Sequence, residues 1–169
     1  MASIHERIVS VLRDTATIVN PEGRFIYGRE VHNTLDYPNM ALPNADAPET
    51  LISLLPFQIS RTNSPDNNYD SASISMVFSR SADVQDNAER EEAILNQMAA
   101  VAENYIELLI TASKPITYSL SDVQMQAEYQ VWMGTASGYV VTFTFSILKG
   151  CELPTIQGLQ NALQSLLQS

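Results

Sequence analysis

The sequence predicts an α+β fold: a mainly antiparallel sheet of about four to five strands, a long helix packed on one face, and a further helix at each end of the chain. In the middle of the sequence, apolar residues recur at alternating steps of four and three, the spacing of one helix face: Ile94, Met98, Val101, Tyr105, Leu108 and Ala112. On both sides of this helix the apolar spacing changes to two, the period of a strand with one buried side.

Length and composition bound the architecture. The chain has 169 residues, about the size of one domain with a full core. We therefore expect a single α+β domain over residues 1–150 and a C-terminal amphipathic helical tail over residues 151–169. The single cysteine, Cys151, cannot form an internal disulfide, which fits assembly in a reducing cytoplasm. No apolar run approaches the roughly 20 residues of a membrane-spanning helix, so no membrane partner is expected.

An opening amphipathic helix is expected over residues 4–19. Ser3 is a suitable N-cap, and Glu6 stands three residues later, at the position of a capping-box partner. Pro21 follows the last apolar position and ends the helix. The next run, residues 24–32, predicts a strand because it contains aromatic and β-branched residues at irregularly alternating positions.

A long loop or arm is expected over residues 33–50, where three prolines are spread among Asn, Asp and Ala: Pro38, Pro43 and Pro48. Loops of this length without helix or strand pattern are uncommon in compact domains and are usually functional. We therefore expect this arm to contact a partner. The apolar run that follows, residues 51–60, predicts a strand, and Pro56 places it at a sheet edge or a bulge.

A strand with one buried and one solvent-facing side is expected over residues 72–80, because three apolar residues alternate with serines: Ile74, Met76 and Phe78. The long helix follows, with Asp83 or Asp86 as its N-cap and several acidic residues in its first turns, where the helix dipole favours anions. Pro115 marks the end of this helix.

A long β-hairpin is expected at the end of the domain, over residues 116–133 and 139–148. Apolar side chains occupy alternate positions of the first strand: Val123, Met125, Ala127, Tyr129 and Val131. In the second strand the core positions alternate with Thr and Ser: Val141, Phe143, Phe145 and Ile147. The turn between the strands, residues 134–138, begins and ends with glycine, which supports a hairpin.

The C-terminal tail has an apolar stripe at helical spacing: Ile156, Leu159, Leu163, Leu166 and Leu167. An isolated helix of about 15 residues is marginal in water, so the stripe must pack on another surface. That surface is either the sheet of the same chain or a neighbouring subunit.

Trp132 and Tyr139 flank the hairpin turn. Trp132 is out of phase with the buried side of its strand, and an exposed Trp at a hairpin end is typical of interfaces. The alternative is local packing against the opposite strand or the long helix. Together with Pro38, Pro43, Pro48, Ile156, Leu159, Leu163 and Leu166, these two residues are our candidate interface residues.

The charge balance argues against nucleic-acid binding. Nine Lys and Arg residues against nineteen Asp and Glu residues give a net charge of −10, and the basic residues are scattered, whereas binding to phosphates requires clusters. We expect no specific contact with DNA, although an acidic surface suits a ring through which DNA passes without sticking.

No residue pattern predicts catalysis, a metal site or a cofactor. His5 and His32 lack the spacing of metal ligands, and we expect them to be solvated or structural. Asp66, Asn68 and Asp70 resemble the start of a calcium loop, but the glycine and glutamate that such a loop requires are missing, so the choice is between a weak surface site and a solvated turn. Two acidic residues four positions apart, Glu103 and Glu107, form either the solvated side of the long helix or a contact for a basic partner.

The order of elements resembles the tail-terminator and head-tail connector (neck) proteins of tailed phages. The resemblance covers roughly residues 3–149 and lies in the leading helix, the early strands divided by a long loop, the serine-flanked strand SISMVFSRSAD, the long helix and the terminal hairpin. It implies a ring-forming, homo-oligomeric structural protein of the virion tail or neck, assembled in the host cytoplasm and contacting other neck or tail proteins.

We therefore expect an assembly protein and not an enzyme. The second interpretation is a small non-enzymatic binding module that holds a peptide or ligand with the proline-rich arm of residues 33–50. The two differ in oligomer size. An enzyme is the third interpretation and would require a cleft with converging Asp, Glu or His side chains, which the sequence does not predict.

Overall fold

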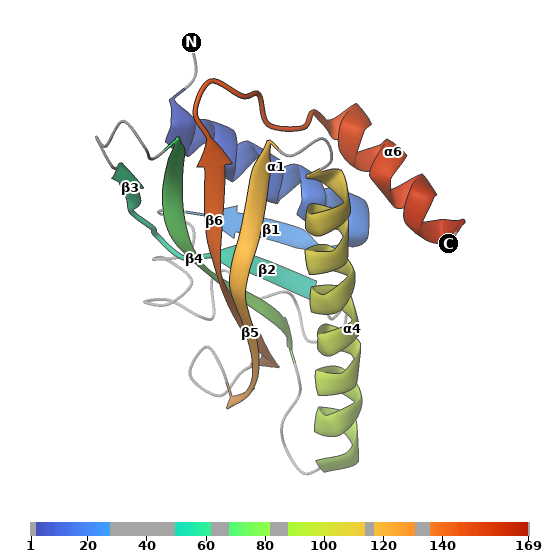
Figure 1. Cartoon of the computed structure of the whole chain (residues 1–169). Coiled ribbons are helices and arrows are strands. Elements are labelled where there is room, and N and C mark those ends of the chain that lie inside the picture. Colours follow the sequence, from blue (N-terminus) through green and yellow to red (C-terminus); the bar gives the residue numbers. More distant parts are fainter. Residues whose placement is uncertain are drawn as a thin grey trace.

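The computed structural model describes residues 3–27, 50–61, 68–81, 88–113, 117–130 and 136–168. Within these residues there are three helices and six strands (Figure 1). In chain order they are α1 (Ile4–Val19), β1 (Arg24–Tyr27), β2 (Thr50–Leu54), β3 (Ile59–Arg61), β4 (Tyr69–Ser81), α4 (Ala88–Ala112), β5 (Tyr118–Gln130), β6 (Ala136–Leu148) and α6 (Ile156–Leu167). The predicted α+β class is confirmed.

The sheet has the strand order β1-β2-β4-β6-β5, and β3 pairs with β4 beyond the end of β2. All pairs are antiparallel except β1 with β2, which is parallel. Most strand pairs are antiparallel, as expected, but the predicted sheet of about four to five strands is corrected to a mixed sheet of six among the described residues. A parallel pair needs a connection of a dozen or more residues, and residues 28–49 between β1 and β2 supply that length.

Pro56, expected at a sheet edge or a bulge, lies instead between two short strands, and the first of them, β2, is paired on both sides. The strands β2 and β3 follow one another along the same side of β4, and residues 55–58 separate them. The Leu55 amide still donates a hydrogen bond to the Ser75 carbonyl, 3.0 Å away. Proline has no amide hydrogen to continue this pairing, so the break falls at the residue that tolerates it.

The termini of α1 and the start of α4 follow the local sequence signals. Ser3 and Glu6 form both hydrogen bonds of the capping box, and α1 ends at Val19 with Asn20 as its C-cap. Glu89 and Glu91 lie in the first turn of α4. The candidate caps Asp83 and Asp86 lie outside the described residues.

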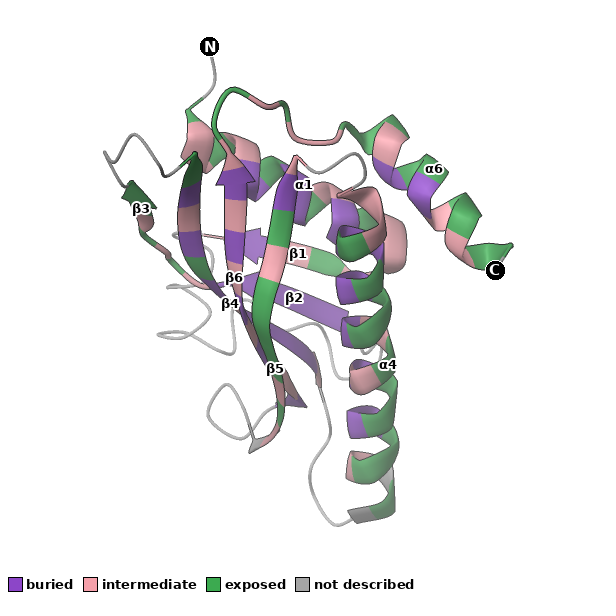
Figure 2. Ribbon diagram, viewed as in Figure 1, coloured by how far each residue is buried: buried purple, intermediate pink, exposed green. Residues whose placement is uncertain are grey.

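The main core joins alternate side chains of the sheet with buried residues of α1 and α4. The alternate residues Ile74, Met76 and Phe78 of β4 are fully buried, as are the expected core positions of β6, and they share one cluster with buried residues of both helices (Figure 2). Phe78 meets Tyr105 of α4 edge to face, with ring centroids 5.3 Å apart. The periods read from the sequence therefore identify the buried side chains of both strands and helices.

The opposite side of the sheet is not uniformly solvated, which corrects the expectation for β4. Ser79 is fully buried, and Val77 joins a second small cluster with Ile26, Leu51 and Ala136. These residues sit at the end of β4 that pairs with β2, where the sheet is widest. Toward the other end of the strand, Ser73 is exposed as expected.

A β-bulge changes the phase of β5. The pairing with β6 shifts between Ser121 and Gln124, and Asp122 adopts a left-handed conformation with φ of 54°. Tyr118 faces the core before the bulge, while after it the odd-numbered Met125 pairs with the core residue Val141. Val123, expected in the buried row, is 38% exposed because it lies in the bulge. The predicted hairpin is present, but its first strand has two phases.

Two buried tyrosines tie the helices to the rest of the core. The Tyr105 hydroxyl of α4 donates to the Leu12 carbonyl of α1 at 2.9 Å, and the Tyr118 hydroxyl of β5 donates to the Leu109 carbonyl of α4 at 2.5 Å. Both residues are fully buried, and burial raises the pKa of each phenol. The two bonds join α1, α4 and β5 inside the core, where an unpaired polar group would be costly.

The first prediction concerns the Tyr105 hydroxyl. Replacing it in Tyr105→Phe leaves the Leu12 carbonyl without this donor, and should lower the free energy of unfolding by about 1 to 3 kcal/mol. Tyr139→Phe is the control because that ring is half-buried on the same side of the sheet; it should change stability by less than about 0.5 kcal/mol. Urea denaturation measures the free energy of unfolding of both variants. Equal losses of stability would contradict the proposed contribution of the Tyr105 hydrogen bond.

The second prediction concerns alkaline pH. In the unfolded chain both tyrosines lose their protons near the ordinary pKa of 10.0, whereas the folded protein retains them because burial raises both pKa values. The folded state then binds more protons, so stability should fall as pH rises above 10, by about 1.4 kcal/mol per pH unit for each tyrosine. In Tyr105→Phe the free energy of unfolding should fall less steeply with pH, by the contribution of one tyrosine. The same slope as in the original chain would contradict this account.

Candidate interaction surface

The C-terminal helix α6 packs on the helical layer. It contacts α4 and α1 (Figure 1). Leu159 is fully buried and Leu163 and Leu166 are half-buried, whereas Ile156 is 47% exposed. The Thr155 side chain caps the helix by accepting a hydrogen bond from the Gly158 amide at 3.4 Å. In the single chain the leucine stripe therefore has a place to pack, and Ile156 remains at the surface.

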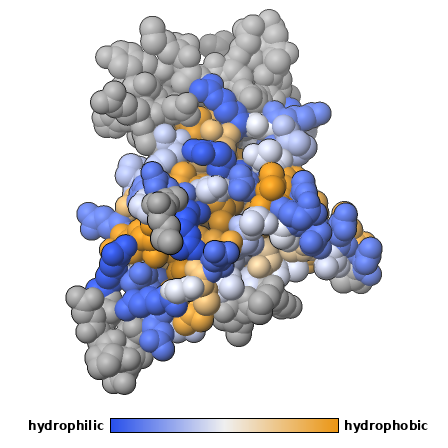
Figure 3. Space-filling model, turned by 90° about the horizontal axis from the view of Figure 1, so that it is seen from above, coloured by the Kyte–Doolittle hydropathy of each residue, from blue (hydrophilic) through white to orange (hydrophobic). Residues whose placement is uncertain are grey.

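A shallow hollow of about 370 Å³ lies between α1 and the segment that leads into α6. Its lining combines apolar and polar side chains of both parts: Arg7, Ser10, Val11, Asp14, Leu153, Pro154, Thr155 and Ile156. The Arg7 guanidinium donates to the Cys151 carbonyl at 2.7 Å and so fixes one wall. Figure 3 looks onto this end of the molecule and shows apolar side chains among hydrophilic ones.

The other predicted interface residues are placed unequally. Pro38, Pro43, Pro48 and Trp132 lie outside the described residues. Tyr139 is half-buried and packs against the small cluster of Ile94 and Met98 on α4. That is the local packing weighed as the alternative for this residue. The predicted interface residues of the tail therefore lie together on α6. Tyr139 lies apart from them, on the core side of β6.

Hydroxyl side chains and one glutamine form transverse rows on the sheet face that points away from the helices. The strand registers align residues of β3, β4, β6 and β5 in one row, and residues of β4, β6 and β5 in two more. The rows are Ser60–Ser71–Ser146–Ser119, Ser73–Thr144–Ser121 and Ser75–Thr142–Gln124. We call these residues the hydroxyl face. All of them are exposed or half-buried.

Charged side chains on this face of the sheet lie only at its margins, among the described residues. The residues of β4 and β6 that point to this face are uncharged, because the acidic and basic residues of β4 fall in the opposite phase. Asp122 lies in the bulge of β5, where it accepts a hydrogen bond from the Ser121 hydroxyl at 3.0 Å. Glu128 follows near the end of β5, and Arg24 begins β1 at the other margin.

The sequence reveals the serines and threonines of these strands but not their rows. Alternation within residues 71–75 and 142–146 identifies which side chains share a face. Their alignment across strands depends on the register of non-local pairs, and the bulge at Asp122 sets that register for β5. No local signal marks the bulge apart from the Ser-Asp pair that interrupts the apolar alternation.

The His5 side chain makes packing and polar contacts with two aromatic residues of other segments. Its Nε2 atom lies 2.8 Å from the Tyr27 hydroxyl, and its ring stacks on Phe57 with centroids 4.6 Å apart. The three residues join α1, β1 and the segment between β2 and β3. Partial burial raises the pKa of Tyr27. His32, the other histidine, lies outside the described residues.

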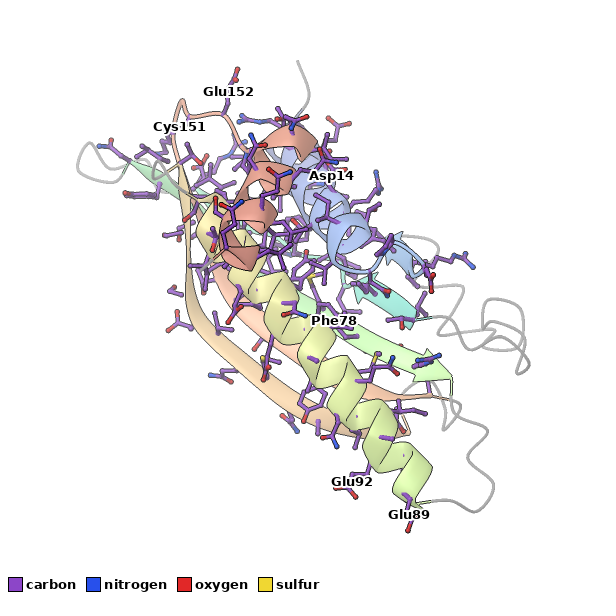
Figure 4. All side chains as sticks on the ribbon, turned by 90° about the vertical axis from the view of Figure 1, so that its right-hand side faces the viewer. Asp14, Phe78, Glu89, Glu92, Cys151 and Glu152 are labelled. Carbon is purple, nitrogen blue, oxygen red and sulfur yellow. The ribbon has the colours of Figure 1, made fainter. Side chains whose placement is uncertain are left out.

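Among the described residues, the acidic side chains singled out in the sequence as possible binding sites lie on two separate elements, β4 and α4. Glu103 and Glu107 are exposed on α4, and Figure 4 shows Glu89 and Glu92 at its far end. Asp70 is largely buried, with a carboxylate oxygen 4.0 Å from the Arg61 guanidinium. Asp66 of the calcium-like segment lies outside the described residues.

The third prediction uses the contrast within α6. Leu159→Ala removes a fully buried side chain from the contact of α6 with α1 and α4, and should lower stability by about 2 to 5 kcal/mol. Leu167→Ala is the matched control, since the Leu167 side chain is 79% exposed; its effect should stay below about 0.5 kcal/mol. Thermal and urea unfolding test the pair, and a silent Leu159→Ala would show that α6 is not held at this position in solution.

Among the described residues, no group of three or more His, Cys, Asp and Glu side chains is placed to hold a metal ion. No helix in this part of the chain has both the length and the apolar character needed to cross a membrane. In comparisons with known proteins, no family model and no curated protein matches the chain.

Proposed function

We propose that the chain is a structural assembly protein that forms homo-oligomeric rings, of the kind represented by tail terminators and head-tail connectors of tailed phages. The observation that carries the proposal is the margin strand β5. It is 13 residues long, and among the described residues no other strand pairs with its outer edge. Figure 4 shows it along one border of the sheet, away from α1.

An open strand edge is a surface for self-association. Its free amide and carbonyl groups can pair with another strand, and proteins that stay monomeric usually blunt such an edge with Lys, Pro, short length or a cover. The β5 sequence contains neither Lys nor Pro, and only its bulge at Asp122 interrupts the edge. These features favour pairing with a further strand over permanent exposure to water.

The hydroxyl face supports a role in a larger particle. Uncharged polar groups lose less on desolvation than charged ones, so such a face can be covered by a protein partner at low cost. The chain as a whole carries a net charge of −10, which disfavours adhesion to DNA passing nearby. The proposed partners are copies of the chain itself and other neck or tail proteins, and the proposed location is the virion. The role requires neither catalysis nor a cofactor.

The fourth prediction tests assembly directly. The mass of the purified chain, measured by light scattering behind a sizing column, should be that of a closed oligomer that persists when the protein is diluted tenfold. The truncation that removes residues 154–169 should weaken association and keep cooperative unfolding of the domain. A chain that remains monomeric at all concentrations would contradict self-assembly and would favour a binding module built on the arm of residues 33–50.

A further inference from the structure

The two margins of the sheet carry opposite charges at the two ends of a single row. Arg24 of β1 pairs with Leu51, Leu51 with Ser79, Ser79 with Gly138, and Gly138 with Glu128 of β5. Residues aligned in one row point to the same face of a sheet. The Arg24 and Glu128 side chains therefore share the face that points away from the helices, and they lie at opposite borders of it.

Within one chain these two side chains cannot reach each other. Four strand spacings of about 4.8 Å separate β1 from β5, which places their backbones about 19 Å apart. Arg24 is exposed and Glu128 half-buried. No hydrogen bond or ion pair links them to each other in the described structure. Any pairing of these two charges must therefore be between molecules.

The strand directions are suited to such a pairing. The strand β1 runs parallel to β2, and each following strand of the row runs opposite to its neighbour. As a result β5 is antiparallel to β1 within one chain. If the sheet of one molecule continued into the next, β5 would meet β1 in antiparallel orientation, the more stable of the two pairings.

We propose that copies of this chain join head to tail, with the β5 margin of one molecule against the β1 margin of the next and Glu128 beside Arg24. The inference rests on the proposed function, because it names the surface through which the ring forms. The contact is heterologous, so successive copies close into a ring when the rotation between them permits, and otherwise form a filament.

A two-fold contact, in which the β5 margins of two copies meet each other, fits the charges of these margins less well than the head-to-tail contact. Two β5 strands related by a two-fold axis would bring four acidic side chains together, since each strand carries Asp122 and Glu128 and no basic residue. For a chain with a net charge of −10, contacts that do not match opposite charges are repulsive. Joining β5 to β1 places an arginine of one copy beside an acidic residue of the other.

Charge reversal at each margin tests the proposal. In Glu128→Arg and in Arg24→Glu, every head-to-tail contact holds two like charges, and the association constant should fall by about tenfold or more. In the double variant every contact again holds one charge of each sign, so association should return to within about threefold of the original chain. Sedimentation equilibrium measures these constants, and circular dichroism checks that each variant is folded.

Mixing provides a sharper version of the same experiment. Each single variant should associate weakly alone, but an equimolar mixture should associate more strongly than either, because each contact between unlike variants pairs a glutamate with an arginine. A two-fold contact between β5 strands would not involve Arg24, so Arg24→Glu alone would then assemble like the original chain. Glu92→Arg is the control, because it makes the same charge change on the exposed side of α4 and should leave association unchanged.

The outcomes separate this inference from the proposed function. A ring that persists in both single variants would overturn the head-to-tail contact and leave ring assembly standing. A chain that is monomeric before any substitution would overturn both. If Glu128→Arg does not fold, the milder Glu128→Gln and Arg24→Gln form a double-mutant cycle, in which additive effects on association would overturn direct contact between the two side chains.

Discussion

The architecture depends on β6, the second strand of the hairpin, being paired on both sides. All 13 of its residues pair with β4, and most also pair with β5. This pairing determines which side chains of β4 and β5 point to each face of the sheet, because a shift of the register by one residue would turn every side chain to the other face. Phe143 and Phe145 then enter the core beneath the helices, while Thr142 and Thr144 reach the opposite face. The core and the hydroxyl face are therefore two results of one register.

The helical layer is attached to this register by a few polar contacts within an apolar core. The Tyr105 and Tyr118 hydroxyls bond to helix carbonyls, and the Ser137 hydroxyl at the start of β6 donates to a Glu91 carboxylate oxygen at 2.7 Å. Apolar packing is tolerant of small displacements, whereas hydrogen bonds restrict position and angle. These bonds define where α1, α4 and the hairpin lie relative to one another.

Sequence patterns could predict the elements that depend on nearby residues. The capping box at Ser3, the apolar stripe of α4 and the alternation of β6 are all local signals, and each agrees with the structure. The parallel pairing of β1 with β2, the burial of Ser79 and the rows of the hydroxyl face require the alignment of distant strands, which no local period encodes. The same limit applies to the candidate contact surface, because Arg24 and Glu128 become related only through three intervening strands.

The bulge at Asp122 has a consequence for how mutations act along β5. It divides the strand into two segments of opposite parity, so a residue number alone does not tell which face a substitution will reach. Loss of a single residue at this point would give the whole strand one continuous alternation of faces. Met125 would then turn to the solvent-facing side and Gln124 to the core side, although neither residue is changed. Length changes at this position would therefore be more disruptive than most replacements, which makes the spacing of β5 part of the information that specifies the fold.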